Sequence, residues 1–396
     1  MKIAVPEAVE AIIKTLNDHG FEAFAVGGCV RDTLLGREPE DWDITTSASP
    51  LQVKELFRRT IDTGIQHGTV TVMKSHNSYE VTTYRIDGEY EDGRHPKSVQ
   101  FTASLTEDLQ RRDFTINAMA YSHETGIVDE FGGIEDLKSG IIRCVGNPLE
   151  RFTEDALRIL RAIRFSAQLN FKIEPKTREG ISTIAPNMEN ISKERIQAEL
   201  TKLLLSDYPE KIAEVYETGI SRYVSDAFHC ADRSRLCIPS GLPKKKHIRW
   251  AAFLKDTEGK KAVQVLKDLK LDHDTIMRVR ILNQWFYREI PPGKVQLRRA
   301  MSQMEPQQFD DLLTLKKWMG QTGIEELERL TEEIRKNGDC VSLKELKING
   351  TDLLAAGIKP GKQIGEELSR LLNLVLEKPE LNRKEILLKL LTVSKY

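Results

Sequence analysis

The sequence of 396 residues contains few cysteines, and none lies at the close spacing of a metal or redox motif. The five cysteines are scattered along the chain, at Cys29, Cys144, Cys230, Cys237 and Cys340. This distribution suggests neither a disulfide framework nor a zinc site, so we expect ordinary reduced thiols.

Long apolar runs are also absent. No stretch of about 18 apolar residues occurs, which argues against a membrane span. Residues 1–20 have the pattern of an amphipathic helix closed by Gly20, without the basic start and apolar run of a signal peptide. We therefore expect a cytoplasmic protein that has no membrane partner.

An excess of charge of one sign is absent as well, because 59 Lys and Arg stand against 60 Asp and Glu. The overall charge does not indicate a nucleic-acid partner, so any contact with RNA must use local basic patches. The length allows one compact catalytic domain followed by smaller helical modules.

What the sequence does contain changes along its length. The first third has short β-rich runs separated by Gly and polar turns, at residues 21–26, 43–46, 69–73, 79–84 and 99–101. From about Asn147 onward, helical patterns take over, as in residues 154–169 and 192–205. The pattern predicts an α+β fold, with a mixed-sheet domain followed by all-α segments, which we divide into 1–146, 147–205, 206–320 and 321–396.

A glycine pair follows the first predicted strand. In the segment Val26-Gly27-Gly28-Cys29-Val30-Arg31-Asp32, the pair comes just before a helical pattern. Backbone N–H groups at such a turn can approach a phosphate closely, and a helix start adds favourable partial charge. We predict that Gly28 and Arg31 bind a nucleotide, with Arg31 clamping the triphosphate. On its own, a Gly-Gly turn is common and more often structural.

Two carboxylates stand a dozen residues later. Asp41 and Asp43 lie on the next predicted strand, where residues i and i+2 point to the same face. Carboxylates that close repel each other, and Mg²⁺ relieves the repulsion because it prefers oxygen ligands and bridges phosphates. We predict that both are catalytic and bind two Mg²⁺ ions, one activating a 3′-hydroxyl and one steadying the triphosphate. Glu80 is the predicted third catalytic carboxylate, with an outward-facing strand charge as the alternative.

A short helix beginning at Ser104 is predicted to present three charged side chains at its end, Arg111, Arg112 and Asp113. Adjacent arginines suit phosphates, and Asp113 could bond a ribose hydroxyl or orient the guanidinium groups. Asn117 lies in the same segment and is counted among the predicted nucleotide-binding residues. The alternative is a helix C-terminus that merely favours cations.

The helical pattern over residues 154–165 carries a candidate base-recognition pair. Asp155 and Arg158 are three residues apart, which sets an acceptor beside a donor on a helix surface. Cytosine and adenine both offer an amino donor beside a ring acceptor, so the pair would accept CTP and ATP and reject UTP and GTP. Arg161 and Arg164 continue the basic stripe and are predicted to reach the triphosphate or base. The alternative is an intrahelical ion pair on a solvated face.

Taken in order, these motifs resemble those of the class II CCA-adding enzymes, which are tRNA nucleotidyltransferases of the DNA polymerase β-like superfamily. The matches cover roughly residues 20–200. The resemblance implies metal binding by Asp41 and Asp43, a protein template made by Asp155 and Arg158, and a helix-stabilising role for Ser192, Glu194 and Arg195. It also implies a catalytic head (1–146), a neck with the base-recognition helix (147–205), a helical body (206–320) and a tRNA-binding tail (321–396).

The implied activity is template-independent addition of C, C and A to the tRNA 3′ acceptor end from CTP and ATP, with release of pyrophosphate. Poly(A) polymerases and CC-only enzymes share the head motifs. Residues 87–96 resemble the flexible loop that CC-only members lack, and no Gly-Arg-Arg-Phe-like run of bacterial poly(A) polymerases is present. Both features favour full CCA addition.

Two other classes of protein stay open. A small-molecule nucleotidyltransferase would use the same metal-binding head but would not need the pair Asp155 and Arg158. An RNA-binding module with an inactive head would not need the carboxylates. The sequence does not decide between a monomer and a homodimer, or between Mg²⁺ and Mn²⁺, and it does not identify the tail residues that contact tRNA.

Overall fold

The computed structural model describes residues 3–87, 99–234 and 236–392. The chain divides into two compact units, Met1–Ala231 with Gln264–Leu271, and Asp232–Val263 with Asp272–Tyr396. Within the described residues, all strands belong to the first unit and the second is helical. The α+β class is therefore confirmed, while the finer division at residues 146, 205 and 320 stays a prediction.

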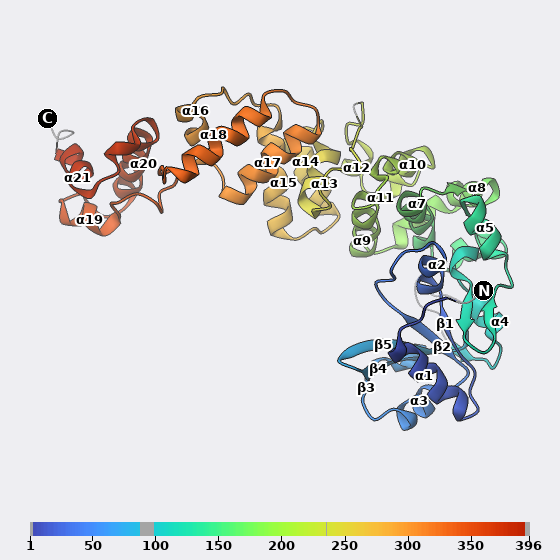
Figure 1. Ribbon diagram of the computed structural model, residues 1–396. Helices are drawn as coiled ribbons and strands as arrows, with labels where there is room; N and C mark the ends of the chain where they lie inside the picture. Colours follow the sequence, from blue (N-terminus) through green and yellow to red (C-terminus); the bar gives the residue numbers. More distant parts are fainter. Residues whose placement is uncertain (1–2, 88–98, 235, 393–396) are drawn as a thin grey trace. The chain divides into compact units, whose positions relative to one another are not determined.

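A mixed sheet forms the framework of the first unit (Figure 1). Strands β2 and β5 are parallel and the other neighbours are antiparallel. The seven strands, in spatial order, are β3 (Thr60–Gly64), β4 (Thr69–Lys74), β5 (Asn77–Thr83), β2 (Asp43–Thr46), β1 (Ala23–Val26), β8 (Ala120–Ser122) and β9 (Gly126–Val128). The predicted runs account for β1, β2, β4 and β5, whereas β3, β8 and β9 were not predicted.

Both faces of β1 are covered, and its four residues are all buried. Helices α1 (Glu7–Asp18) and α3 (Pro50–Leu56) pack on one side of the sheet and touch each other. The buried positions of α1 recur at helical spacing, at Val9, Ile12, Ile13 and Leu16. On the other side, Phe24 and Val26 join a core cluster with Leu109 of α4 (Leu105–Gln110). Strand β1, the direct neighbour of β2, is thus packed between two apolar layers.

The rest of the first unit is mainly helical. Helix α7 packs against α9, and α6 against α8. The further helices are α2 (Gly28–Leu34), α5 (Gly133–Ser139), α6 (Pro148–Glu154), α7 (Leu157–Leu169), α8 (Pro175–Ile184), α9 (Lys193–Leu204), α10 (Ala213–Glu217), α11 (Ser221–Val224) and α12 (Asp226–His229). Two small ribbons pair β6 (Arg85–Asp87) with β7 (Val99–Phe101) and β10 (Ile141–Ile142) with β11 (Lys172–Ile173). Residues 88–96 of the predicted flexible loop lie outside the described residues.

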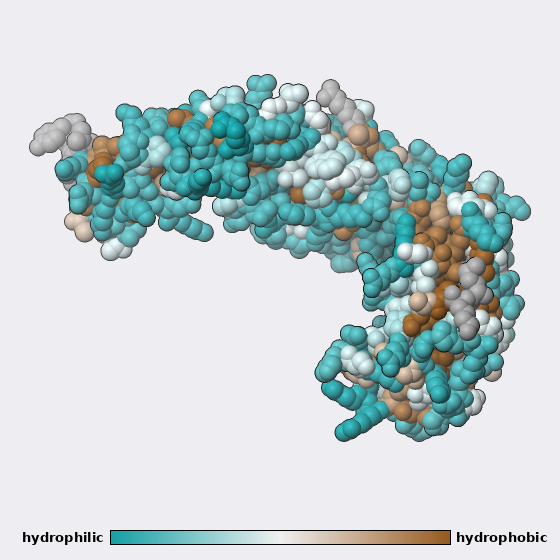
Figure 2. All heavy atoms as spheres, in the orientation of Figure 1, coloured by the Kyte–Doolittle hydropathy of each residue, from teal (hydrophilic) through white to brown (hydrophobic). Residues whose placement is uncertain are grey.

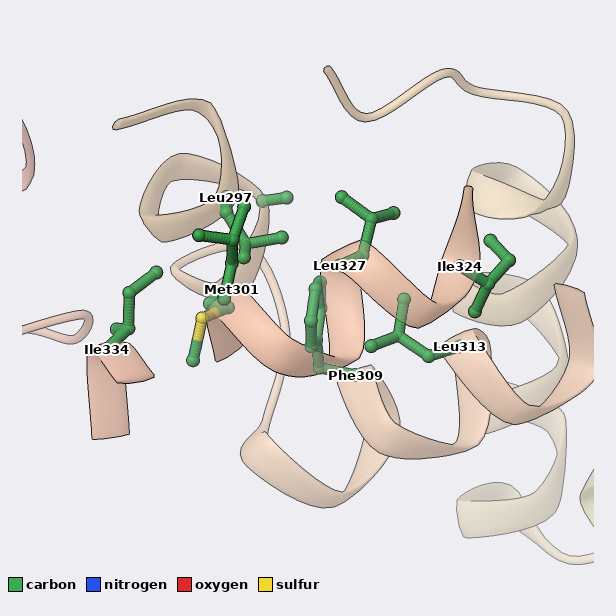
Figure 3. Close-up of a cluster of buried hydrophobic side chains, with 9 residues drawn as sticks. Leu297, Met301, Phe309, Leu313, Ile324, Leu327 and Ile334 are labelled. Atoms are coloured by element: carbon green, nitrogen blue, oxygen red, sulfur yellow. The ribbon is translucent and has the colours of Figure 1, made fainter. Parts of the chain in front are cut away.

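The second unit has its own apolar core. Helices α16 (Lys294–Met301), α17 (Pro306–Trp318) and α18 (Ile324–Lys336) bury the cluster shown in Figure 3, including Leu297, Phe309 and Leu327. The face of the second unit that Figure 2 shows is mostly hydrophilic, as expected for helices that turn their apolar stripes inward. The other helices are α13 (Lys246–Leu254), α14 (Gly259–Asp268, shared with the first unit), α15 (His273–Phe286), α19 (Gly350–Ala355), α20 (Lys362–Glu377) and α21 (Lys384–Thr392).

The last helices are tied to this core by a buried arginine. Arg298 of α16 forms an ion pair with Asp339 at 2.7 Å and donates from Nε to the backbone carbonyl of Leu376 at 2.7 Å. The five cysteines are free thiols, as predicted. In the part of the chain that the structure describes, no helix has the length and apolar character needed to cross a bilayer.

Candidate active site

Two of the predicted catalytic carboxylates lie side by side on the parallel strands. In the register of β2 and β5, Asp43 and Glu80 are direct partners. Both side chains are exposed, and the exposed Asp41 lies two residues before β2 begins. The structure therefore places Glu80 next to the Asp-x-Asp pair.

Desolvation and neighbouring negative charge raise the pKa of two of these carboxylates, Asp43 and Glu80. For Asp43, the surrounding protein raises the pKa by desolvation although solvent still reaches the side chain, Arg112 lowers it, and Asp41 raises it. Desolvation also raises the pKa of Glu80, and the charges of Asp43 and Asp41 raise it further. A cation relieves such repulsion, and carboxylate oxygens are the ligands that hard divalent ions prefer. The donor set therefore fits a divalent metal ion.

Asp43 and Glu80 lie on neighbouring central strands, but the carboxylates do not by themselves surround an ion. Across residues 3–87, 99–234 and 236–392, no three His, Cys, Asp or Glu side chains gather closely enough to hold an ion by themselves. Mg²⁺ in nucleotide sites commonly uses one or two carboxylates and completes its ligands with water and substrate phosphates. An ion bound by these carboxylates would need such additional ligands.

The glycine pair forms a turn directly beside one of the predicted phosphate-binding arginines. Gly27 caps α2 with φ 82° and ψ −128°, a conformation that L side chains rarely adopt. A Cβ at Gly27 would lie 3.0 Å from Nη1 of Arg112. Glycine at this position therefore permits the turn and leaves room for the guanidinium group. Helix α2 begins at Gly28, two residues earlier than predicted.

Arg31, the predicted triphosphate clamp, is largely buried and has protein partners. Its Nη1 donates to Oδ1 of Asn117 at 2.6 Å, and its Nε and Nη2 donate to the Asp32 carboxylate at 2.9 and 2.8 Å. The guanidinium group also lies over the ring of Phe165, 4.9 Å from its centroid. The structure thus joins Arg31 directly to Asn117, another of the predicted nucleotide-binding residues.

Arg111 and Arg112 are held by a carboxylate that sequence reasoning missed. Both guanidinium groups form ion pairs with Asp108, at 2.8 and 3.2 Å. Asp108 is fully buried on α4, and the hydroxyl of Ser104 caps this helix by accepting from the Glu107 N–H. Residues three and four apart on a helix are neighbours, so the spacing of Asp108 from the two arginines is the signal that could have identified it.

Asp113 binds other partners than the two arginines before it. Its Oδ2 accepts from Nε of Arg161 at 2.7 Å, and its Oδ1 accepts from Nδ2 of Asn117 at 3.1 Å. Burial alone would raise the pKa of Asp113, but the charge of Arg161 and the bond from Asn117 outweigh it and bring the pKa to about 2. The carboxylate is therefore ionised at neutral pH and ties this segment to α7.

The single helix predicted over residues 154–169 is wrong at its beginning. Helix α6 ends at Glu154 and α7 begins at Leu157. Oδ1 of Asp155 accepts from the backbone N–H of Leu157 at 3.0 Å, so an aspartate side chain competes for helix hydrogen bonds at the break. The signal for the missed α6 is Asn147-Pro148, a helix cap followed by proline at the first helical position.

Each member of the predicted base-recognition pair is held by a different partner. Oδ2 of Asp155 accepts from Nη2 of Arg195 at 2.7 Å. Arg158 donates from Nη1 to Glu154 at 2.7 Å and from Nη2 to the backbone carbonyl of Arg111 at 3.0 Å. The segment predicted to recognise the base is therefore hydrogen-bonded directly to the segment that contains Arg111 and Arg112.

Arg164 has hydrogen-bond partners of its own, although its guanidinium group lies over the same Phe165 ring as those of Arg31 and Arg161. Its Nε donates to Oε2 of Glu199 on α9 at 2.5 Å, and its Nη1 donates to Gln168 at 2.7 Å. Arg164 and Glu199 are only 7% and 6% exposed. The arrangement makes Arg164 a brace between α7 and α9, whereas Arg161 reaches the Asp113 network.

Carboxylates on adjacent strands of a mixed sheet, beside a glycine turn and two arginines, define a nucleotidyltransferase of the polymerase class. Family models agree with this class. Residues 23–143 match the "Poly A polymerase head domain", residues 170–229 match the "Probable RNA and SrmB- binding site of polymerase A", and residues 243–391 match a model described as tRNA nucleotidyltransferase domain 2.

Relatives similar over nearly their full length narrow the class to one family. A CCA-adding enzyme of Anoxybacillus flavithermus is 39% identical over 394 residues, covering 95% of this chain and 94% of the relative. A CCA-adding enzyme of Ligilactobacillus salivarius is 38% identical over 394 residues, with the same shares covered. The chain belongs to the family of CCA-adding enzymes, which are tRNA nucleotidyltransferases.

Solved structures agree with this assignment. The crystal structure of the Bacillus stearothermophilus CCA-adding enzyme in complex with CTP is 32% identical, with a TM-score of 0.85, and covers 98% of this chain and 97% of that one. A Thermotoga maritima CCA-adding enzyme complexed with tRNA shares the fold, with a TM-score of 0.66 at 23% identity over the full length of both chains. Nucleotidyltransferases of this kind generally use divalent metal ions.

Proposed function

We propose that this chain adds C, C and A to the 3′ end of tRNA, without a nucleic-acid template, from CTP and ATP with release of pyrophosphate. Membership of the family supports the reaction, as does the CTP complex of the relative from Bacillus stearothermophilus. The observation that carries the proposal is the bond from Nη2 of Arg158 to the Arg111 carbonyl at 3.0 Å, because it sets the base-recognition segment against the phosphate-binding arginines. One nucleotide could then contact both.

We propose Mg²⁺ as the divalent ion and a two-ion site. Asp41 and Asp43 would hold the ions, with Glu80 as the neighbouring carboxylate. When bound, the ions would supply positive charge that activates the 3′-hydroxyl and neutralises the phosphates. The raised pKa of Asp43 and of Glu80 supports this assignment. Desolvation is the main cause in both cases and the charge of Asp41 adds to it, so a bound cation would stabilise both ionised carboxylates.

The two adjacent arginines would bind the triphosphate. Arg112 lies beside the Gly27 turn, and its charge acts on Asp43. Arg111 is fixed next to it by the same buried carboxylate. Guanidinium groups bind phosphate oxygens through paired, directional hydrogen bonds. This pair would therefore orient the triphosphate toward the carboxylates proposed to bind the metal ions.

Base choice would rest on Asp155 and Arg158. The Asp155 carboxylate caps Leu157 and binds Arg195, and these bonds fix its orientation while leaving acceptor capacity on its oxygens. It could accept from the amino group of cytosine or adenine. Arg158 would donate to the adjacent ring nitrogen, and uracil or guanine would leave both groups unpaired.

The cytoplasmic location predicted from the sequence stays a prediction.

The direct test is incorporation of labelled CTP and ATP, each alone and then together with Mg²⁺, into a tRNA that ends before its CCA. Two C residues followed by one A are expected. Long A tails would indicate a poly(A) polymerase, and C addition without A would indicate a CC-only enzyme.

A single variant separates catalysis from RNA binding. Asp41→Asn is expected to abolish incorporation and to retain tRNA affinity measured by filter binding, because it removes a metal ligand without removing a basic group. An Asp41→Asn protein that still adds nucleotides at the wild-type rate would contradict the metal-site assignment.

A further inference from the structure

Asp108 combines complete burial with bonds to two arginine side chains and two neutral donors. Its Oδ1 accepts from Nε and Nη2 of Arg111 at 3.0 and 2.8 Å, and its Oδ2 accepts from Nη2 of Arg112 at 3.2 Å. The Thr45 hydroxyl donates at 3.1 Å, and the Arg85 backbone N–H donates at 3.4 Å. Both carboxylate oxygens therefore have partners, and each holds a different arginine.

A carboxylate without solvent exposure must be compensated by its neighbours. Burial alone would raise the pKa of Asp108, but the charges of Arg112 and Arg111 more than reverse this effect and lower it. Asp108 is therefore an ionised group whose one negative charge is shared by two positive ones. The cluster keeps a net positive charge that is available to an anionic ligand.

The two arginines held by Asp108 lie next to three other parts of the predicted site. Nη1 of Arg112 approaches the turn at Gly27, its charge reaches Asp43, and its Nε is buried without a hydrogen-bond partner among the described residues. The carbonyl of Arg111 accepts from Arg158. Rotation of either guanidinium group would break its bond to Asp108 and disturb this arrangement.

We propose that Asp108 is a positioning residue for nucleotidyl transfer, which holds the Arg111 and Arg112 guanidinium groups in the orientation that receives the triphosphate of the incoming nucleotide. The inference rests on the proposed function. Asp108 does not touch the nucleotide and acts through the two arginines. Because the triphosphate is common to CTP and ATP, the effect of Asp108 is the same for both substrates and does not extend to base choice.

The test is Asp108→Asn, which keeps the size of the side chain and removes its charge. Without the carboxylate, the arginines gain rotamer freedom, and misplaced binding groups lower the efficiency of a reaction strongly. We expect KM for CTP and for ATP to rise together, by about tenfold or more, while discrimination against UTP stays unchanged. A variant that is only partly folded would lower kcat at unchanged KM, so the split between the two constants separates positioning from loss of structure.

Asp136→Asn is the matched control. Asp136 is also a buried carboxylate, which accepts from Nε of Arg143 at 3.0 Å and from the Thr115 hydroxyl at 2.6 Å. Neither partner is among the predicted nucleotide-binding residues. Asp136→Asn is expected to lower the melting temperature as Asp108→Asn does and to leave KM at the wild-type value.

Binding of inorganic triphosphate, measured by calorimetry, gives a readout that needs no catalysis. Its affinity is expected to fall in Asp108→Asn and to stay unchanged in Asp136→Asn. Wild-type affinity and KM in Asp108→Asn, or an equal loss in both variants, would overturn the positioning role. If Asp108→Asn does not fold, Asp108→Glu retains the charge but moves it, and an unchanged KM in that variant would overturn the role as well. Failure of the wild-type protein to add C, C and A would instead refute the proposed function.

Discussion

Replacing Arg164 separates a structural role from the nucleotide contact predicted for it. The guanidinium group and the Glu199 carboxylate are both buried and lie 2.5 Å apart. Removing one partner of a buried ion pair leaves the other charge uncompensated, which costs about 3–5 kcal/mol, whereas replacing both by apolar side chains of similar volume is often nearly neutral. We therefore expect Arg164→Met to destabilise the protein by about 3–5 kcal/mol, and the double variant Arg164→Met/Glu199→Met to recover most of that loss.

The assay is urea unfolding followed by circular dichroism for the wild type, both single variants and the double variant. The second readout is KM for CTP, which should be close to the wild-type value in the double variant because its helices α7 and α9 remain packed. A double variant that regains stability but has a strongly raised KM would refute the brace and return Arg164 to the nucleotide site. If the double variant lost as much unfolding free energy as the two single variants together, the coupling between Arg164 and Glu199 would be refuted.

Two further predictions concern carboxylates of the site. Asp155→Ala removes the acceptor proposed for the amino group of the base, so discrimination between CTP and UTP should fall about tenfold to a hundredfold in competition assays, and undiminished selectivity would count against the template. The pKa of Asp113 falls from 3.8 to about 2 on folding, so its stabilisation is present above pH 3.8 and disappears as the pH falls through 2. Asp113→Asn should therefore be less stable by about 2 kcal/mol at neutral pH and should lack this acid-dependent loss in denaturation between pH 4 and 2; the same acid dependence in both proteins would contradict the assignment.

The strands that carry Asp43 and Glu80 were accessible from the sequence. The predicted run at 43–46 coincides with β2, and the run at 79–84 overlaps β5 (Asn77–Thr83), because alternation and β-branched residues mark both strands. The pairing of these two strands could not be predicted in the same way. That Asp43 lies directly opposite Glu80 depends on the parallel register of strands far apart in sequence, and no local pattern specifies that register.

Partner choice among charged residues was harder to predict than the residues themselves. Asp113 and Asp108 both lie near the two adjacent arginines in sequence. Helix spacing makes Asp108 a candidate partner, and the folded structure shows that it binds both arginines while Asp113 does not. The break at Asp155 was hidden for a similar reason, because an acidic residue near the start of a helix also suits an uninterrupted helix. In both cases, hydrogen bonds in three dimensions decided between two locally acceptable arrangements.

The two bonds of Arg111, one through its side chain and one through its backbone carbonyl, matter for engineering the enzyme toward other nucleotides. Its side chain is fixed by Asp108 and its carbonyl by Arg158, so one residue anchors the groups proposed to read the base and those proposed to hold the phosphates. A redesign that replaces Arg158 to change base preference would also release this anchor and impair turnover of every nucleotide. A library of variants selected for use of UTP should therefore keep Arg158 and vary Asp155. The Asp155 side chain is held separately, by Arg195.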